Sequence, residues 1–282
     1  MKIAIAGHSG FLGSNFIRAY PEHEYRMLSR KQLYADPEEL MKAINDAEVI
    51  LNLTGFPIIK RWTKKNRVLI RQSRAGVNRN LVEAVNRNIH KPAMFISASA
   101  IGIYNNTDIH NEKSTAYGSG FLSDVVKEWE ESLSLLDNSI KVVTMRTGMV
   151  LGKDGGAFPM LEKITRYGIG AVVGSGRQMV SFIHIGDYVR AMDFIMKHKF
   201  TGPVNMVVPN PVDYTTFVKT LGKVLNRRIF LRIPEFVVNI LLGAASQVIT
   251  KGQHVVPGRL TEANFTFNYP EPEMAFSNLV GK

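Results

Sequence analysis

The feature that most constrains the fold of this chain is the glycine-rich run Gly7-His-Ser-Gly-Phe-Leu-Gly13 near its start. Before it, Lys2 to Ala6 is a short apolar run of the kind that forms a buried parallel strand. After it, residues 14–20 are expected to form a helix that Pro21 ends. Glycines let the backbone approach a pyrophosphate, and the start of a helix offers free N–H groups to an anion. The order strand, glycine turn, helix therefore predicts a dinucleotide site, although a tight turn that binds nothing has the same spacing.

The composition is that of a globular protein with ample material for a core. The 282 residues are 45% hydrophobic and 21% charged, which suits one large α/β unit or a nucleotide domain with a smaller lobe. The chain has no cysteine, which excludes disulfides and thiolate metal sites. The N-terminus is too polar for a signal peptide, and the longest apolar stretch, residues 236–249, is too short and too polar to span a bilayer. We therefore expect a cytoplasmic protein with no membrane partner.

The net charge of +11 is concentrated in one part of the sequence. Glu83 is the only acidic residue in a basic stretch that contains Lys60, Arg61, Lys64, Lys65, Arg67, Arg71, Arg74, Arg79, Arg87 and Lys91. A basic face of this kind could bind nucleic acid. It lacks interleaved aromatic residues and any accompanying nucleic-acid motif. A solvated helix face, with one or two residues turned toward cofactor phosphates, is the favoured interpretation, and the expected partner is a small-molecule substrate.

Strand-like and helical patterns alternate through the first half of the chain. Apolar runs predict further strands at Tyr25–Ser29, Val49–Leu53, Met94–Ala98 and Val142–Arg146. Helical patterns lie between them at Pro37–Asn45, Lys64–Asn88 and Phe121–Leu136. This alternation predicts an α/β fold with a doubly wound parallel sheet. Because ligands of such sheets lie beyond the carboxyl ends of the strands, the residues that follow each strand are the candidates for a site.

The residues after the second and third strands favour a particular nucleotide. An acidic residue after the second strand would accept the 2′-hydroxyl of NAD, but Ser29, Arg30 and Lys31 stand there. Arg30 and Lys31 can instead pair with a 2′-phosphate, which favours NADP, although a basic surface pair that binds nothing is the alternative. After the third strand, Gly55 would let the backbone pass over adenine or ribose, and a plain turn glycine explains it equally well.

The later strands are followed by small and hydroxyl-bearing residues. Ser99 and Tyr104 come after the fourth strand, where small neighbours leave space for a ligand. Gly152, Gly155 and Gly156 follow the fifth strand and predict a mobile loop beside a site. Further on, Asp187 is expected to cap a helix, and His184 before it is expected to be a hydrogen-bonded structural residue.

Together these motifs resemble those of the extended short-chain dehydrogenase/reductase family, within its NAD-dependent epimerase/dehydratase branch and the YfcH-like epimerase-family subgroup. The resemblance covers nearly the whole chain and rests on GHSGFLG at 7–13, LSRK at 28–31, NLTG at 52–55, RW at 61–62, SR at 73–74, ISASAIGIY at 96–104, FLSDVVKEWE at 121–130, RTGMVLGKDGGA at 146–157, GSGRQMVSFIHIGD at 174–187, GPVNMVVP at 202–209, HVVPGRL at 254–260 and FNYP at 267–270. It implies a Rossmann doubly wound parallel sheet with a smaller C-terminal substrate lobe. We expect the Rossmann domain at 1–155, with 179–205 returning to it, and the lobe at 156–178 and 206–282.

The resemblance also implies a set of cofactor residues for NADP (NADPH). These are Gly7, Ser9, Gly10, Phe11 and Leu12 in the first turn, Ser29, Arg30 and Lys31 at the 2′-phosphate, Leu53, Thr54 and Gly55 beside the ribose, Arg74 of the SR pair, and Val126 on a later helix.

The catalytic residues that the resemblance implies are absent. Active members use a Tyr and a Lys four residues later to move a proton, and these positions fall on Leu122 and Val126. The usual Ser or Thr falls on Ala100, which leaves Ser99 and Tyr104 as the candidate donors. Two substrate markers of the family, an Asn and an Arg, are Met149 and Val180 here.

Two functions remain open at this point. One is an atypical NADP-dependent oxidoreductase or epimerase acting on a small carbonyl, hydroxyl or sugar-like substrate. The other is a catalytically silent NADP(H)-binding sensor or regulatory protein. The sequence leaves the oligomeric state, monomer or homodimer, undetermined.

Overall fold

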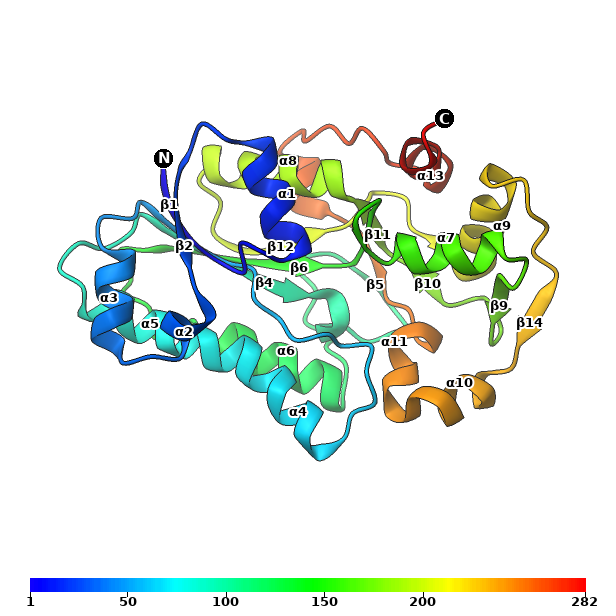
Figure 1. Cartoon of the computed structure of the whole chain (residues 1–282), viewed down its shortest axis with the longest axis horizontal. Helices are drawn as coiled ribbons and strands as arrows, with labels where there is room; N and C mark the ends of the chain where they lie inside the picture. Colours follow the sequence, from blue (N-terminus) through cyan, green and yellow to red (C-terminus); the bar gives the residue numbers. More distant parts are fainter.

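A computed structural model describes residues 1–282 and has a six-stranded parallel sheet at its centre (Figure 1). The strand order is β12-β6-β4-β3-β1-β2, and every neighbouring pair is parallel. The strands are β1 (Lys2–Ala6), β2 (Glu24–Leu28), β3 (Val49–Asn52), β4 (Met94–Ala100), β6 (Lys141–Thr147) and β12 (Gly202–Met206). The expectation of an α/β fold with a parallel, Rossmann-like sheet is confirmed.

The chain reverses its direction of winding at β1. It passes from β1 to β2 on one side, and then returns across β1 to β3 on the other. In the Rossmann order 3-2-1-4-5-6, a further strand lies outside the second strand. This sheet lacks that strand, and β2 is therefore its edge strand. Such a switch point is where open α/β sheets bind ligands. The glycine turn that follows β1 lies at this switch point.

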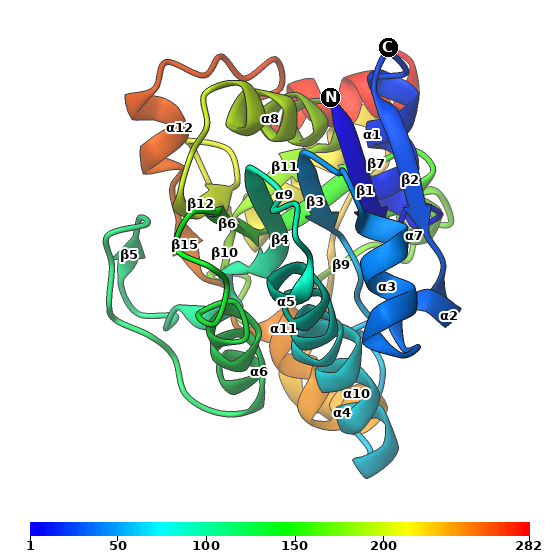
Figure 2. The same cartoon turned by 90° about the vertical axis from the view of Figure 1, so that its left-hand side faces the viewer.

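Helices cover both faces of the sheet (Figures 1 and 2). On one face lie α1 (Phe11–Ala19) and α8 (Ile185–Lys197), and buried Phe16 and Tyr188 join the core cluster of this face. On the other face, α3 (Pro37–Ile44) and α5 (Val77–Arg87) pack on the sheet, where Leu40 and Leu81 are fully buried. The elements α2 (Arg30–Leu33), α4 (Lys64–Arg71) and α6 (Phe121–Glu131) complete this second layer. The doubly wound arrangement follows from strands that are apolar on both faces.

Three helix predictions need correction in detail. The helix predicted at 64–88 is interrupted by a π-helical turn at Gln72–Gly76, between α4 and α5. The helix predicted at 121–136 ends at Glu131 and continues as turns. The N-cap of α8 is His184, whose Nδ1 accepts a hydrogen bond from the Gly186 N–H at 3.0 Å. Asp187, predicted as that cap, is fully buried and accepts hydrogen bonds from two backbone N–H groups of a distant loop instead.

The rest of the chain forms short strands and helices beside the sheet. The short strands are β5 (Ile109–His110) with β15 (His254–Val255), β7 (Met149–Gly152) with β8 (Gly155–Gly156) and β11 (Phe182–His184), β9 (Ala171–Val173) with β14 (Leu231–Ile233), and β10 (Met179–Val180) with β13 (Val212–Asp213). The helices are α7 (Phe158–Arg166), α9 (Tyr214–Val224), α10 (Glu235–Leu242), α11 (Gln247–Thr250), α12 (Gly258–Glu262) and α13 (Pro272–Val280), with 3-10 turns at Ile101–Ile103 and Gly243–Ser246.

This second part of the molecule has a core of its own. Buried side chains of α7, α9, α13 and the short strands form one apolar cluster, with Phe217 and Phe276 at 0% exposure. Leu260 and Phe265 also come from this part of the chain, but they pack in the core of the main sheet and not in this cluster. The boundaries expected for the C-terminal lobe stay predictions. None of the helices has the length and apolar character needed to cross a membrane.

Candidate nucleotide site and the buried network behind it

The turn after β1 is held in a tight shape by its glycines. Gly7 has φ +83°, and the Gly10 N–H donates to the Gly7 carbonyl at 3.0 Å. A Cβ on Gly13 would lie 2.4 Å from the Gly7 oxygen, so only glycine lets α1 begin this close to β1. Gly10 is the N-cap of α1 and brings no side-chain oxygen, which leaves the N–H groups of Phe11 and Leu12 without an acceptor in the protein. Free N–H groups at the positive end of a helix are suited to an anion.

The turn also meets the end of the neighbouring strand β3. A Cβ on Gly7 would stand 2.9 Å from the carbonyl carbon and oxygen of Leu53. The structure therefore brings the predicted residues of the first turn and those of the 53–55 loop together at the switch point. Ser9 is exposed beside them and Leu12 packs partly into the core.

The glycines of the β7–β8 hairpin have a packing explanation. A Cβ on Gly152 or on Gly155 would lie 2.4 Å from atoms of the Phe11 ring. Gly156, with φ +71°, closes the β7–β8 hairpin over the same ring. In the sequence, these glycines predicted a mobile loop beside a site. In the structure they leave room for the Phe11 ring, which packs the start of α1 against the second part of the molecule.

The residues after β2 present two cations without partners. Ser29 caps α2 by a reciprocal pair of hydrogen bonds with Gln32, in which the Ser29 N–H donates to Gln32 Oε1 at 2.8 Å. This cap fixes where the next two residues emerge. Arg30 and Lys31 are both exposed, and neither makes an ion pair or a side-chain hydrogen bond within the protein. They follow Leu28, which is paired in register with Ala6 just before the glycine turn.

Arg74 projects from the π-helical turn toward the loop after β3. Its Nη1 donates to the Phe56 carbonyl at 3.1 Å, and its guanidinium lies 5.1 Å from the centre of the Trp129 ring. No carboxylate pairs with it, and burial lowers its pKa to about 10. A Cβ on Gly55 would lie 3.3 Å from Arg74 Nη2, so glycine at position 55 leaves room for this cation. At neutral pH the group is charged and has no counter-ion in the chain.

An amide network beneath this loop was not foreseen from the sequence. Asn52 and Asn78 are both fully buried, and Asn52 Nδ2 donates to Asn78 Oδ1 at 2.7 Å. Thr54 Oγ1 donates to Asn52 Oδ1 at 2.7 Å, which fixes the loop to the end of β3. The only sign of this network in the sequence is that Asn52 and Asn78 each stand among apolar residues. That pattern does not show that the two side chains are in contact.

The predicted donors Ser99 and Tyr104 lie behind the strand ends in a buried ionic network. Ser99 Oγ donates to Glu130 Oε1 at 2.6 Å, and Arg146 binds the same carboxylate at 2.9 and 2.7 Å. Arg146 also donates to the Tyr104 hydroxyl at 2.8 Å, and that hydroxyl has two acceptors within reach, Asn205 Oδ1 at 3.0 Å and the Asn111 carbonyl at 3.1 Å.

This network occupies both predicted hydroxyls. Ser99 and Tyr104 are 3% and 1% exposed. Burial raises the pKa of Tyr104, whereas a tyrosine that abstracts a proton at neutral pH needs a lowered one. The catalytic role expected of these two residues stays a prediction. Glu130 and Arg146, which organise the network, were not foreseen as partners, because their pairing joins α6 to β6.

Leu122 and Val126, which stand where the family's Tyr and Lys are expected, also have apolar surroundings in the structure. Val126 is 4% exposed and packs with Tyr104, Val207 and Val255. Leu122 lies one turn earlier on α6 and packs against the cluster of Trp62 and Ala245. Val126 can therefore offer a cofactor only apolar contact. Tyr117 is 42% exposed, and Lys127 Nζ lies 6.0 Å from its ring centre.

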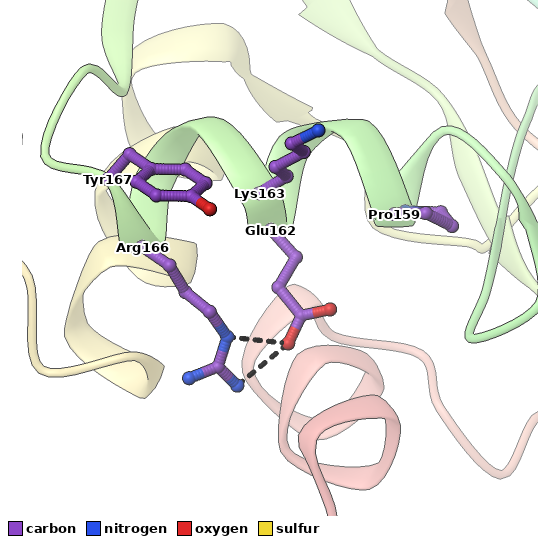
Figure 3. Close-up of a pocket in the computed structure, with 5 residues that line it drawn as sticks. All are labelled: Pro159, Glu162, Lys163, Arg166 and Tyr167. Carbon is purple, nitrogen blue, oxygen red and sulfur yellow. Dashed lines mark hydrogen bonds and ion pairs between the residues drawn. The ribbon is translucent and has the colours of Figure 1, made fainter.

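Two surface hollows lie away from the carboxyl ends of the strands. One is formed by α7 side chains, where Glu162 and Arg166 are paired at 2.7 Å (Figure 3). The other runs along the amino ends of β6 and β12. Neither contains a residue predicted for the cofactor or for catalysis.

Comparison with known proteins agrees with this geometry. The profile of the NAD dependent epimerase/dehydratase family matches residues 3–208, which include all of the central sheet except Lys2. A second profile, a domain of unknown function (DUF1731), matches residues 233–279.

Relatives of similar length are found in plants, bacteria and humans. The epimerase family protein SDR39U1 homolog of Arabidopsis thaliana is 30% identical over 95% of this chain and 84% of its own. The epimerase family protein SH2119 of Staphylococcus haemolyticus is 32% identical over 99% of both chains. The crystal structure of human SDR39U1 (isoform 2) with NADPH superposes with a TM-score of 0.93 and 26% identity, over 100% of both chains. The chain therefore belongs to the NAD dependent epimerase/dehydratase family.

Proposed function

We propose that this protein binds NADP(H) across the carboxyl ends of β1, β2 and β3. The observation that carries the proposal is that a helix N-terminus without a side-chain cap and two unpaired cations follow adjacent strands. The N–H groups of Phe11 and Leu12 are free, and Arg30 and Lys31 have no acidic partner. A dinucleotide with a 2′-phosphate has anionic groups for both places. The NADPH in the human relative's structure is further support.

The residues at the switch point fit such a cofactor. Gly7, Ser9, Gly10, Phe11 and Leu12 would receive the pyrophosphate at the start of α1. Ser29, Arg30 and Lys31 would hold the 2′-phosphate side, and Leu53, Thr54 and Gly55 would line the ribose. Arg74, which lacks a counter-ion in the chain, would face an anionic group of the cofactor. Val126 would contribute apolar contact from α6.

We propose further that the bound cofactor serves an oxidoreductase or epimerase reaction on a small carbonyl, hydroxyl or sugar-like substrate. Nicotinamide supplies or accepts a hydride when bound. A hydride that adds to a carbonyl carbon forms a C–H bond and displaces the C=O π pair onto the oxygen, which then takes up one proton. Ser99 and Tyr104 are the hydroxyls proposed to serve that oxygen. A substrate would then have to replace Glu130 as the partner of Ser99, or the two acceptors of Tyr104, which are Asn205 Oδ1 and the Asn111 carbonyl. If the proton comes from solvent instead, Ser99 and Tyr104 can keep their hydrogen-bond partners.

A second function, an NADP(H)-binding sensor without turnover, is favoured by a separate observation. Both hydroxyls are engaged inside the protein, and the positions of the usual Tyr and Lys are Leu122 and Val126. The glycine loop at 152–156, which would cover an active face in an enzyme, is explained by the packing of Phe11. A sensor needs the nucleotide site alone.

Nucleotide titration tests the binding proposal. We expect NADPH to bind more tightly than NADH in a fluorescence titration, and Arg30→Ala to reduce that preference about tenfold by removing one charge-assisted contact. Lys163→Ala on α7 is the matched control, because Lys163 is also exposed and unpaired. Equal affinity for the two nucleotides in the wild type would refute the assignment of Arg30.

Turnover separates the two functions. NADPH oxidation is followed at saturating cofactor over a panel of small aldehydes, ketones and keto-sugars. For the enzyme, we expect a substrate whose kcat falls on Ser99→Ala or Tyr104→Phe while NADPH affinity is unchanged. Background rates over the panel, with NADPH binding intact, would favour the sensor.

A further inference from the structure

One end of the molecule combines exposed apolar side chains with unpaired cations. It is built from the loop at 57–63, α4 and α10, which lie together at the lower end of the molecule in both views (Figures 1 and 2). We call it the α4–α10 surface. Its large apolar side chains are strongly exposed: Ile59 (49%), Val68 (51%), Phe236 (63%), Ile240 (66%) and Leu241 (68%). Phe236 and Ile240 are one helical turn apart and share a face of α10.

The cations of this surface have no ionic partners in the chain. They are Lys60, Arg61, Lys64, Lys65 and Arg67, all of them exposed and none of them in an ion pair. The acidic side chains of the adjoining helices are fewer than these cations. Glu235 begins α10, Asp124 and Glu131 are exposed on α6, and Glu128 of α6 is already bound to Arg71.

The two halves of the surface are joined rigidly although they are distant in sequence. Arg61 Nη2 donates to the Ile240 carbonyl at 2.8 Å, which ties the basic loop to α10. Beneath them, buried Trp62, Ile70 and Ala245 form one apolar cluster against which Leu242 packs. The exposed apolar residues are therefore presented on a fixed scaffold and do not belong to a loose segment.

We propose that the α4–α10 surface docks on an anionic phospholipid surface. The apolar side chains of α10 would enter the boundary between headgroups and acyl chains, while the lysines and arginines lie against anionic headgroups. A lipid interface satisfies both kinds of side chain at once. The expectation of no membrane partner rested on the absence of a spanning stretch, and docking on a lipid surface requires no such stretch.

Charge and apolar character argue against two other occupants. A second copy of the chain, docked face to face through this surface, would place five unpaired cations against five others, and like charges in contact disfavour association. Nucleic acid would neutralise the cations but leave Phe236, Ile240 and Leu241 in water. Neither occupant uses the whole surface.

Vesicle flotation with the full-length protein tests the proposal. We expect the protein to float with vesicles of phosphatidylglycerol and phosphatidylcholine, and not with vesicles of phosphatidylcholine alone. Lys64→Gln with Lys65→Gln should weaken partitioning about 25-fold, because each basic residue near such a surface contributes about fivefold. Phe236→Ser with Ile240→Ser should weaken it by at least tenfold.

Matched controls change the same chemistry elsewhere. Lys163→Gln with Lys219→Gln removes two exposed, unpaired lysines, and Ile89→Ser with Leu135→Ser removes two exposed apolar residues. Both controls should float like the wild type, and NADPH titration of every variant reports whether it is folded.

Three outcomes would overturn the proposal. The first is no flotation with anionic vesicles at low salt. The second is flotation that the lysine variant abolishes but the Phe236 and Ile240 variant leaves unchanged, which would mean electrostatic adsorption without insertion. The third is a concentration-dependent dimer that the Phe236 and Ile240 variant dissociates, which would assign the apolar face to a second copy.

Discussion

Arg146 binds the carboxylate of Glu130 through two hydrogen bonds, 2.7 and 2.9 Å long, in the interior between α6 and β6. The side chains are 4% and 17% exposed. Each partner has a further polar contact, since Ser99 donates to Glu130 and Arg146 donates to Tyr104. A buried pair contributes to a unique structure only when its other hydrogen-bonding groups are also satisfied, and here the two hydroxyls satisfy them.

Breaking this pair should destabilise the protein strongly. We expect Glu130→Gln to lower the free energy of unfolding by about 3 kcal/mol, because Arg146 is then left buried without its counter-ion. Urea unfolding measures the change. Glu83→Gln is the control, because Glu83 pairs with Arg87 on an exposed helix face and should cost less than about 1 kcal/mol. A loss no larger than that of the control would show that the network is not a source of stability.

The glycine turn can be tested through its closest contact. We expect Gly13→Ala to abolish NADPH binding, because its Cβ would lie 2.4 Å from the Gly7 oxygen and would push α1 away from β1. Gly102→Ala is the matched control, since nothing lies within 4 Å of a Cβ there. Isothermal titration of both variants gives the comparison. Wild-type affinity in the Gly13 variant would contradict the proposed role of the turn.

The local patterns of the sequence predicted the parallel sheet well. Alternating apolar runs and a glycine turn are properties of short segments, and β1 was predicted with its observed limits, Lys2–Ala6. Side chains that follow adjacent parallel strands must lie near one another, which is why the residues after each strand could be named as candidates, and the structure places Gly7 against Leu53.

The unpredicted parts depend on contacts between distant segments. Glu130 and Arg146 meet only because α6 packs beside β6, and no local pattern reports this. The capping of α8 by His184 was missed for a similar reason. Aspartate is the more common capping residue, but the carboxylate of Asp187 accepts hydrogen bonds from the backbone of a loop more than eighty residues later.

Arg74 should affect ligand binding without affecting stability. We expect Arg74→Met to raise the Kd for NADPH about tenfold, because an anionic group of the cofactor would lose its partner. The free energy of unfolding should change by less than about 1 kcal/mol, since the loss of a hydrogen bond to Phe56 is offset by removal of a desolvated cation. Titration and urea unfolding of the same preparation separate the two effects. Unchanged affinity, or an equal loss in both measurements, would show that Arg74 has a structural role alone.

His184 should make stability depend on pH. It is 4% exposed, its ring centre lies 4.0 Å from that of Tyr269, and its Nδ1 accepts the Gly186 N–H. Burial lowers the pKa of His184 to about 4, while the nearby carboxylate of Asp187 opposes the shift. An unfolded histidine has a pKa of about 6.5, so between about pH 6.5 and 4 the unfolded chain binds the proton first. The contribution of the neutral imidazole is therefore complete above about pH 6.5 and falls by about 3 kcal/mol as the pH approaches 4.

The substitution His184→Asn isolates this contribution. Asparagine can still accept the Gly186 N–H at the start of α8, but it does not titrate. Chemical unfolding of both proteins between pH 8 and pH 4 gives the difference in their free energies, in which the titration of all other groups cancels. We expect the wild type to lose about 3 kcal/mol relative to the variant over that range. A difference that does not vary with pH would mean that His184 is as free to take a proton in the folded protein as in the unfolded chain.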